Sequence, residues 1–241
     1  MDSNTAQAGD AYRVALFAMA SLAELRESDT ESHLLRVQNY VRILAVQLQS
    51  RPHLAGALTP QAIETLVAAV PMYDLGTLGV PDRILLKPGR LSPDEVAIMR
   101  THTTLGYEAI ARAERTQNCN APLLEVAKEI TAAHHEKWNG KGYPKGLAGA
   151  AIPLSARIVA LADVFDALIS NKVYKEGMSH DAAVRLISTE RGEHFSPDVV
   201  DAFLEVHPQF EAIAKRYADT DADMQQKIEY MANAIAEIAV L

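Results

Sequence analysis

Two adjacent histidines, His134 and His135, end an apolar run with helical spacing, and a glycine-rich loop closing with Gly142-Tyr143-Pro144 follows directly. Imidazole is the side chain found most often as a metal ligand, and glycine allows a backbone to approach a bound group closely. No structural role obviously requires this combination. The stretch therefore predicts one wall of a metal or ligand site, provided that other segments supply further ligands.

Further histidines and carboxylates lie on or at the ends of separate predicted helices. A lone helical histidine is usually a surface or hydrogen-bonded residue, so a metal centre requires several such side chains to converge. Packing of these helices as a bundle would bring them together. The candidate ligands are Asp29, His33, Asp74, His102, His134, His135 and Asp163.

Mixed imidazole and carboxylate ligation predicts a divalent metal, and it suits iron, manganese or zinc better than calcium or magnesium. A carboxylate such as Asp74 can bridge two ions, and a water held between them becomes the nucleophile for attack on a phosphodiester. The residue types are compatible with a metal-dependent phosphohydrolase, and a purely structural role for single members of the set stays open.

The segments that must position these ligands have helical patterns. Apolar residues repeat at helical spacing over 31–49. Thr59-Pro60 has the pattern of an N-cap followed by proline, and Ser92–Glu95 has that of a capping box, starting a helix predicted to continue through Ile110. Further helices are predicted over 123–134, over 158–169 and after Ser179 and Ser196, and no strand alternation is found. The fold class predicted is all-α, a compact helical bundle.

Both ends of the chain are predicted to be helical extensions of this bundle. A helix over about 10–27 presents Val14, Phe17, Ser21 and Leu25 on one side, and the C-terminal segment repeats Met224, Ile228, Met231, Ile235 and Ile238. Such stripes specify burial but not the partner, so completion of the monomer's core and homodimerisation both stay open. We divide the chain into an N-terminal helical extension (1–21), a central domain (22–218) and a C-terminal amphipathic helix (219–241).

The composition of the chain limits the cellular environment and the classes of partner that we expect for the protein. Apolar residues make up 49% of the chain, enough for a sizeable core, and the net charge of -8 argues against DNA or RNA as a partner. No apolar run is long enough to span a membrane and no signal peptide is recognised. Cys119 is the single cysteine and cannot form an internal disulfide, which favours a reducing, cytoplasmic location.

Over roughly residues 22–218, the chain resembles the HD-GYP family, the cyclic di-GMP phosphodiesterase branch of the HD metal-dependent phosphohydrolases. The resemblance implies an all-helical HD-domain fold, a centre of two or three metals often containing iron, and hydrolysis of cyclic di-GMP to pGpG or GMP. It rests on the segments 33–36, 79–82, 87–89, 134–144, 146–147, 152–153, 157–159, 162–168 and 174–175, together with His102 and Gly106.

The same resemblance assigns roles to individual residues. All seven candidate ligands match metal-binding positions of the family, with Asp74 as the bridging, catalytic carboxylate. Gly142, Tyr143 and Pro144 match the name-giving loop, which borders the substrate pocket. The ion expected is iron or manganese, with one or two per chain.

Four positions depart from the family pattern, one of them Glu31, which replaces a glycine. Tyr73 stands where the family has a histidine ligand, and Thr77 stands where it has a lysine that helps to hold the substrate phosphate. Asp29 replaces the usual glutamate and is one methylene shorter. Because Tyr73, Thr77, Asp29 and His33 belong to the first metal position or its edge, we expect that site to be weakened or vacant and at least one metal to remain. Lys175 is a candidate substitute for the missing lysine, although an ordinary solvated lysine is the simpler interpretation.

Two functions of different classes therefore stay open. One is a working cyclic di-GMP phosphodiesterase. The other is an inactive module that binds cyclic di-GMP or a diguanylate cyclase through Trp138 and Tyr143. Hydrolysis of another phosphorylated nucleotide is a weaker third option. Since only one helix precedes Asp29, we expect input to come from a partner such as a receiver domain, from the terminal helices or from the ligand.

Overall fold

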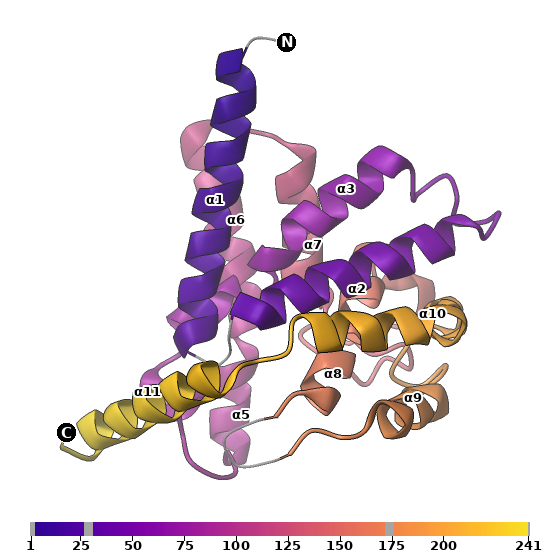
Figure 1. Ribbon diagram of the computed structural model, residues 1–241. Coiled ribbons are helices and arrows are strands. Elements are labelled where there is room, and N and C mark those ends of the chain that lie inside the picture. The colour runs from indigo at the N-terminus through magenta and orange to yellow at the C-terminus, as the bar shows by residue number, and fades with distance from the viewer. Residues whose placement is uncertain (1–2, 27–30, 172–175, 241) are drawn as a thin grey trace.

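The computed structural model describes residues 3–26, 31–171 and 176–240, and these residues form helices joined by turns, with no strand beyond two isolated bridges (Figure 1). The all-α prediction is confirmed. The elements are α1 (Ser3–Arg26), α2 (Glu31–Gln49), α3 (Pro60–Ala69), η1 (Val70–Met72), η2 (Leu75–Gly79), α4 (Asp82–Leu85), α5 (Pro93–Arg100), α6 (His102–Gln117), α7 (Pro122–Ala133), η3 (Gly149–Ala151), α8 (Leu154–Ile169), α9 (His180–Thr189), α10 (Pro197–Arg216) and α11 (Asp221–Val240).

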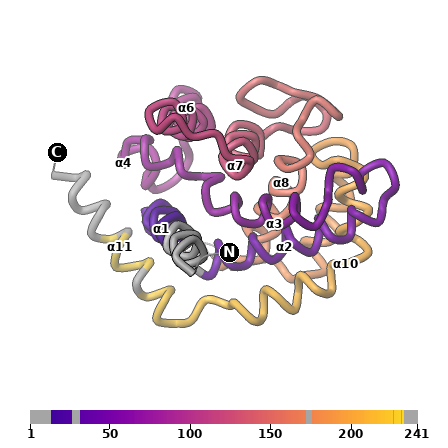
Figure 2. Tube along the Cα trace, turned by 90° about the horizontal axis from the view of Figure 1, so that it is seen from above, coloured from indigo at the N-terminus to yellow at the C-terminus, as the bar shows by residue number. Residues whose placement is uncertain are grey.

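The core lies where α2, α8 and α10 pack together, and α2 and α10 run side by side in both views (Figures 1 and 2). An aromatic cluster fills this junction. Tyr40 of α2 stacks on Phe210 of α10 with ring centroids 4.4 Å apart, and Phe165 of α8 meets both rings edge-on. All three rings are fully buried, so burial of apolar surface fixes the three helices relative to one another.

Local sequence signals account for where several helices begin. The hydroxyl of Thr59 accepts a hydrogen bond from the backbone N–H of Ala62 at 3.2 Å, as an N-cap does. Ser92 and Glu95 form the reciprocal pair of a capping box, and α9 and α10 begin directly after Ser179 and Ser196. These predicted starts are confirmed, as is the helix over 31–49.

One predicted helix is wrong in its length. The segment from Ser92 to Ile110 does not form a single helix, because it divides at Thr101 into α5 and α6. At the division, the ring Nδ1 of His102 lies 2.8 Å from the carbonyl oxygen of Met99, to which it donates. The division turns His102 toward η2, where a Cβ on Gly76 would lie 1.9 Å from the His102 carbonyl oxygen. Only glycine permits this approach, which brings Asp74 close to His102.

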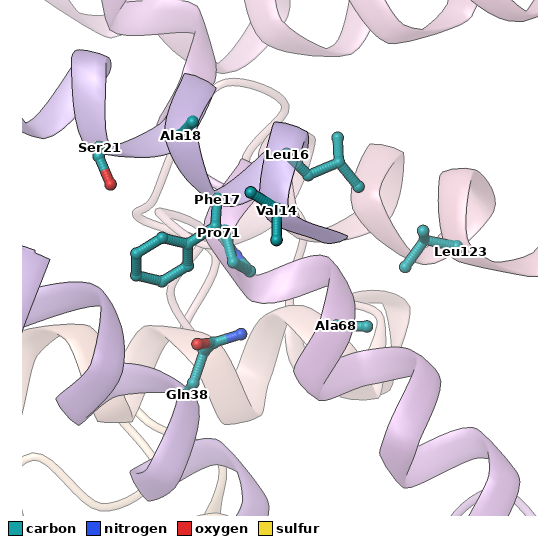
Figure 3. A pocket seen from close by; sticks show the side chains of 9 residues that line it. All are labelled: Val14, Leu16, Phe17, Ala18, Ser21, Gln38, Ala68, Pro71 and Leu123. Carbon is teal, nitrogen blue, oxygen red and sulfur yellow. The ribbon is translucent and has the colours of Figure 1, made fainter. Parts of the chain in front are cut away.

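The N-terminal helix α1 runs unbroken across the predicted domain boundary at residues 21/22, and that division stays a prediction. Of its predicted stripe, Ser21 is buried and Phe17 is half-buried, whereas Val14 is 69% exposed. An apolar pocket of about 420 Å³ is lined by α1 together with residues of α2, α3, η1 and α7 (Figure 3). On α11, Ile228 is 43% exposed, and homodimerisation through the terminal helices stays a prediction.

None of the described helices combines the length and the apolar composition needed to cross a bilayer.

Candidate metal centre

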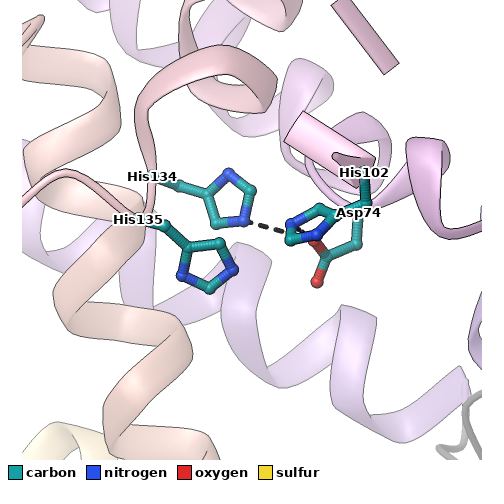
Figure 4. A group of neighbouring side chains, drawn as sticks. All are labelled: Asp74, His102, His134 and His135. Carbon is teal, nitrogen blue, oxygen red and sulfur yellow. Dashed lines mark ion pairs between the residues drawn. The ribbon is translucent and has the colours of Figure 1, made fainter. Parts of the chain in front are cut away.

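Four of the predicted ligands converge on one point. Asp74 precedes η2, His102 begins α6, and His134 and His135 follow the last turn of α7. One ligand atom from each lies within 4.8 Å of the others (Figure 4). The Oδ1 atom of Asp74 is 3.2 Å from Nε2 of His134 and 3.4 Å from Nε2 of His102.

Backbone carbonyls fix the orientation of two of these imidazoles. The Nδ1 atom of His102 donates to the carbonyl oxygen of Met99, and that of His134 donates to the carbonyl oxygen of Ile130, both at 2.8 Å. A neutral imidazole that donates through Nδ1 carries a lone pair on Nε2. Both lone pairs therefore face Asp74, which is the arrangement that carbonyls around metal sites commonly impose.

Three atoms at the centre are buried without a hydrogen-bond partner: Oδ1 of Asp74, Nε2 of His102 and Nε2 of His134. Buried polar atoms are almost always satisfied, and three acceptors facing each other repel unless a cation lies between them. One carboxylate and three imidazoles form a donor set that suits a divalent transition metal. The residues present therefore fit the divalent metal predicted from the sequence.

Burial and the charges of the neighbouring ligands shift the pKa values of all four side chains. Burial opposes ionisation of Asp74, but the neighbouring imidazoles outweigh it and lower the pKa of this carboxyl group. Burial lowers the pKa of His102 and lowers that of His135 further, with the charge of His134 adding to the effect on both. Burial also disfavours the charge on His134, yet Asp74 raises its pKa above the ordinary value.

A hydrogen-bonded chain lies beside this centre and contains two further predicted ligands. The hydroxyl of Tyr73 donates to Oδ1 of Asp163 at 2.9 Å. The hydroxyl oxygen of Tyr73 also lies 2.8 Å from Nε2 of His33. The other ring nitrogen of His33 is 2.8 Å from Asp166, whose two oxygens accept from Arg36 at 2.7 and 2.8 Å. Tyr73 thus contacts two side chains that the family resemblance assigns to metal binding.

The hydroxyl of Tyr73 is held in its neutral form. Burial is the main cause of its raised pKa, and the charges of Asp163, Asp74 and Glu24 act in the same direction. A neutral phenol is a poor metal ligand compared with the imidazole of a histidine. Tyr73 accordingly fills the space beside the centre as a hydrogen-bonding group.

The Gly-Tyr-Pro loop folds back on the metal centre. The ring of Tyr143 stacks on that of His135, with centroids 4.7 Å apart, and its backbone N–H bonds to the His135 carbonyl oxygen. A Cβ on Gly142 would lie 2.3 Å from the backbone nitrogen of Lys137, so a glycine is required for this close approach. Tyr143 lines the cavity beside the centre, and Trp138 does not.

Glu136 fixes this loop, although the sequence analysis did not single it out. The side chain is 2% exposed, and its two oxygens accept hydrogen bonds from the backbone N–H groups of Lys145 at 2.7 Å and Leu147 at 2.9 Å. The available signal was its position directly after His135. A carboxylate there offers two acceptors to a loop whose backbone donors would otherwise have no partner.

We expect Glu136→Gln to destabilise the protein by about 1–3 kcal/mol, because the amide turns a donor toward a backbone N–H. Urea unfolding measures this change, and the emission of Trp138, the single tryptophan, reports loosening of the loop. Glu193→Gln is the matched control, since Glu193 is exposed and accepts only from the side chain of Asn139. Equal stabilities for the two variants would contradict the role given to Glu136.

The remaining predicted residues lie at or beyond the edge of the cavity. Thr77 is 1% exposed, and its hydroxyl donates to the carbonyl oxygen of Asp74. Asp29 and Lys175 lie outside the described residues. Glu24 was missed, although a carboxylate in the apolar C-terminal half of α1 was a signal. It lines the cavity, with an oxygen 3.9 Å from Nε2 of His33.

Known proteins share both the sequence and the fold. A family model described as the HD domain matches residues 19–199. A Vibrio cholerae protein described as a probable cyclic di-GMP phosphodiesterase is 51% identical over 209 residues, covering 87% of this chain and 47% of that protein. A second, described as a cyclic di-GMP phosphodiesterase, is 48% identical over 206 residues, covering 86% and 42%. The chain spans about half the length of these curated relatives.

Among solved structures, a cyclic GMP-AMP-specific phosphodiesterase of Vibrio cholerae superposes with a TM-score of 0.57 at 19% identity. The superposition covers 93% of this chain and 59% of that one. At this identity the likeness speaks for the fold alone, and it agrees with the helical arrangement described above.

Proposed function

Because this chain belongs to the HD domain family, in its HD-GYP branch, we propose that it hydrolyses the phosphodiester of cyclic di-GMP to pGpG or GMP. The observation that carries the proposal is the convergence of three buried, unpartnered acceptor atoms, on Asp74, His102 and His134. Such a cluster is costly in a folded protein unless a cation occupies it. The names of the relatives support the choice of substrate.

The metal, when bound, supplies a Lewis acid that activates a water molecule and stabilises charge on the phosphate oxygens. Asp74 and the three imidazoles hold it, with Asp74 as the negatively charged ligand. The carbonyls of Met99 and Ile130 keep the Nε2 lone pairs directed at the centre. Tyr143, stacked on His135, lines the cavity in which the substrate would bind.

We further propose that this chain holds one iron or manganese ion in place of the larger centre implied by the family resemblance. In that resemblance, His33 belongs to the first metal position and Asp163 to the ligands that hold the rest of the centre. Here the hydroxyl of Tyr73 lies 2.8 Å from His33 and 2.9 Å from Asp163. A hydroxyl at this place excludes an ion that would need the same two ligands.

The second candidate function is a signalling module that binds cyclic di-GMP without turning it over. Two observations favour it. Tyr73 is hydrogen-bonded to two of the predicted metal ligands, His33 and Asp163, and Thr77 bonds to a backbone carbonyl and brings no charge to the pocket. A module of this kind would act through a partner such as a diguanylate cyclase or a receiver domain.

Metal analysis combined with a product assay tests the proposal. The protein is stripped with a chelator, reconstituted with ferrous iron or manganese, and analysed for metal content and for release of pGpG. We expect one ion per chain and product formation that depends on the ion. Protein that binds the ion and cyclic di-GMP tightly but releases no product would exclude the hydrolase and favour the module.

A further inference from the structure

The cavity beside the metal centre is rich in negative charge. It has a volume of about 290 Å³, and Glu24, Asp74 and Asp163 line it, whereas no lysine or arginine among the described residues does. A cyclic dinucleotide brings a further negative charge at each of its two phosphates. One divalent ion held by the carboxylate of Asp74 does not offset both phosphates, so a further cation close to the cavity favours binding of such a ligand.

Thr77 does not provide this cation. Its hydroxyl is uncharged and donates to the carbonyl oxygen of Asp74, and the side chain is buried in the wall of the cavity. The nearby guanidinium of Arg26 is already engaged, because it donates to the carbonyl oxygens of Thr77 and Val80 and pairs with Asp82. Within the described residues, the positive charge therefore has to come from another element beside the cavity.

Arg100 is positioned to supply that charge. It ends α5, two residues before the ligand His102, and its guanidinium carbon lies 4.7 Å from the centroid of the Tyr143 ring. In the described parts of the chain, no carboxylate forms an ion pair with Arg100, and the side chain is exposed. A guanidinium stacked on an aromatic ring keeps the N–H donors at its edge free for a phosphate.

The ring beneath Arg100 connects it with the metal centre. Tyr143 lines the cavity and stacks on His135, so the exposed guanidinium lies beside the cavity, across the Tyr143 ring from the buried ligand atoms. The two phosphates of a cyclic dinucleotide are held apart by its ring of two nucleotides. A phosphate at the metal centre therefore leaves the second phosphate away from the buried ligand atoms.

We propose that Arg100 binds the phosphate of the cyclic dinucleotide that is not at the metal centre, providing the charge that Thr77 lacks. The proposal rests on cyclic di-GMP being the ligand of this site, as proposed above. Arg100 fixes the ligand without touching the reacting phosphorus, and so it contributes equally to the ground state and the transition state.

A charge series at position 100 tests this role. The manganese-loaded 241-residue chain is titrated with the hydrolysis-resistant bisphosphorothioate analogue of cyclic di-GMP, using Arg100→Lys, Arg100→Met and Arg100→Glu. We expect Arg100→Met to bind about tenfold to a hundredfold more weakly, as loss of hydrogen bonds to a charged group implies. Arg100→Lys should fall between it and wild type, and Arg100→Glu should be weakest. With cyclic di-GMP itself, KM should rise in the same order while kcat stays within about twofold.

The control is Arg112→Met, which removes an exposed guanidinium further along α6 and should leave the affinity unchanged. Wild-type affinity should also fall more steeply with rising salt than that of Arg100→Met. The role of Arg100 would be overturned if wild type and Arg100→Met bound the analogue equally well. It would also be overturned if Arg100→Lys bound no better than Arg100→Met. Neither result would affect the proposed cyclic di-GMP site itself. No binding by the wild-type chain would overturn the cyclic di-GMP site together with the role of Arg100.

Discussion

Replacing Asp74 with asparagine is expected to abolish metal binding and to lower phosphodiester turnover by at least about a thousandfold. The carboxylate is the only charged ligand in the four-residue cluster, and its Oδ1 faces two imidazole lone pairs. An amide oxygen carries no net charge and binds a transition metal weakly. Loss of the ion removes several kcal/mol of transition-state stabilisation, and each 1.36 kcal/mol corresponds to about a tenfold change in rate.

The Asp74→Asn variant should nevertheless fold. The Oδ1 atom of Asp74 lies against the ring nitrogens of His102 and His134, and an asparagine of nearly the same shape can still donate to or accept from these nitrogens. We therefore expect the metal-free variant to melt at or above the temperature of the metal-free wild type. Asp221→Asn, an exposed position at the start of α11, is the control that should retain full metal content. An Asp74→Asn protein that is folded and retains its metal would remove this carboxylate from the centre.

The location of the centre could be predicted because it depends on patterns that are local in the sequence. Capping signals at Thr59 and Ser92 correctly predicted where α3 and α5 begin, the helices that precede Asp74 and His102 in the chain. The apolar spacing predicted α7, which His134 directly follows. When helices pack through their apolar faces, polar residues beside those faces are brought close to one another at the helix ends. The convergence of four ligands from three separate segments followed from that constraint.

The details that decide chemistry depended on contacts between segments far apart in the chain. The break at Thr101 involves a side-chain hydrogen bond from His102 and the approach of Gly76, which no periodicity reveals. Similarly, Tyr73 could be recognised as a replaced ligand, but the side chains that its hydroxyl contacts lie 40 and 90 positions away. Glu24 came from the helix predicted to be an extension, and it lines the cavity beside His33. The sequence did not show in which direction these side chains point, and that direction decides what they contact.

The double variant Tyr73→His with Thr77→Lys is expected to bind a second ion and to increase turnover by at least about tenfold. At present the phenol of Tyr73 is hydrogen-bonded to both His33 and Asp163. An imidazole at position 73 would offer a nitrogen ligand in place of the phenol and would leave those two side chains free to bind an ion. A lysine at position 77, which lines the cavity, would add the positive charge that a phosphate requires.

The single variants separate the two effects. Tyr73→Phe removes only the hydroxyl, so it should free His33 and Asp163 without adding a ligand, and we expect little gain in metal content. Tyr73→His alone should raise the number of ions per chain, whereas Thr77→Lys alone should lower KM. Metal analysis and steady-state kinetics measure both quantities on the same preparations.

Each outcome bears on the choice between enzyme and binding module. A large gain in turnover for the double variant would identify the natural chain as a weakened catalyst whose limit lies at Tyr73 and Thr77. Two ions per chain without any gain would place the limit elsewhere in the pocket. Wild-type protein that already holds two ions would show that the Tyr73 hydroxyl does not exclude the second. In that case the hydrogen bonds to His33 and Asp163 belong to the metal-free state, and the ion displaces them on binding.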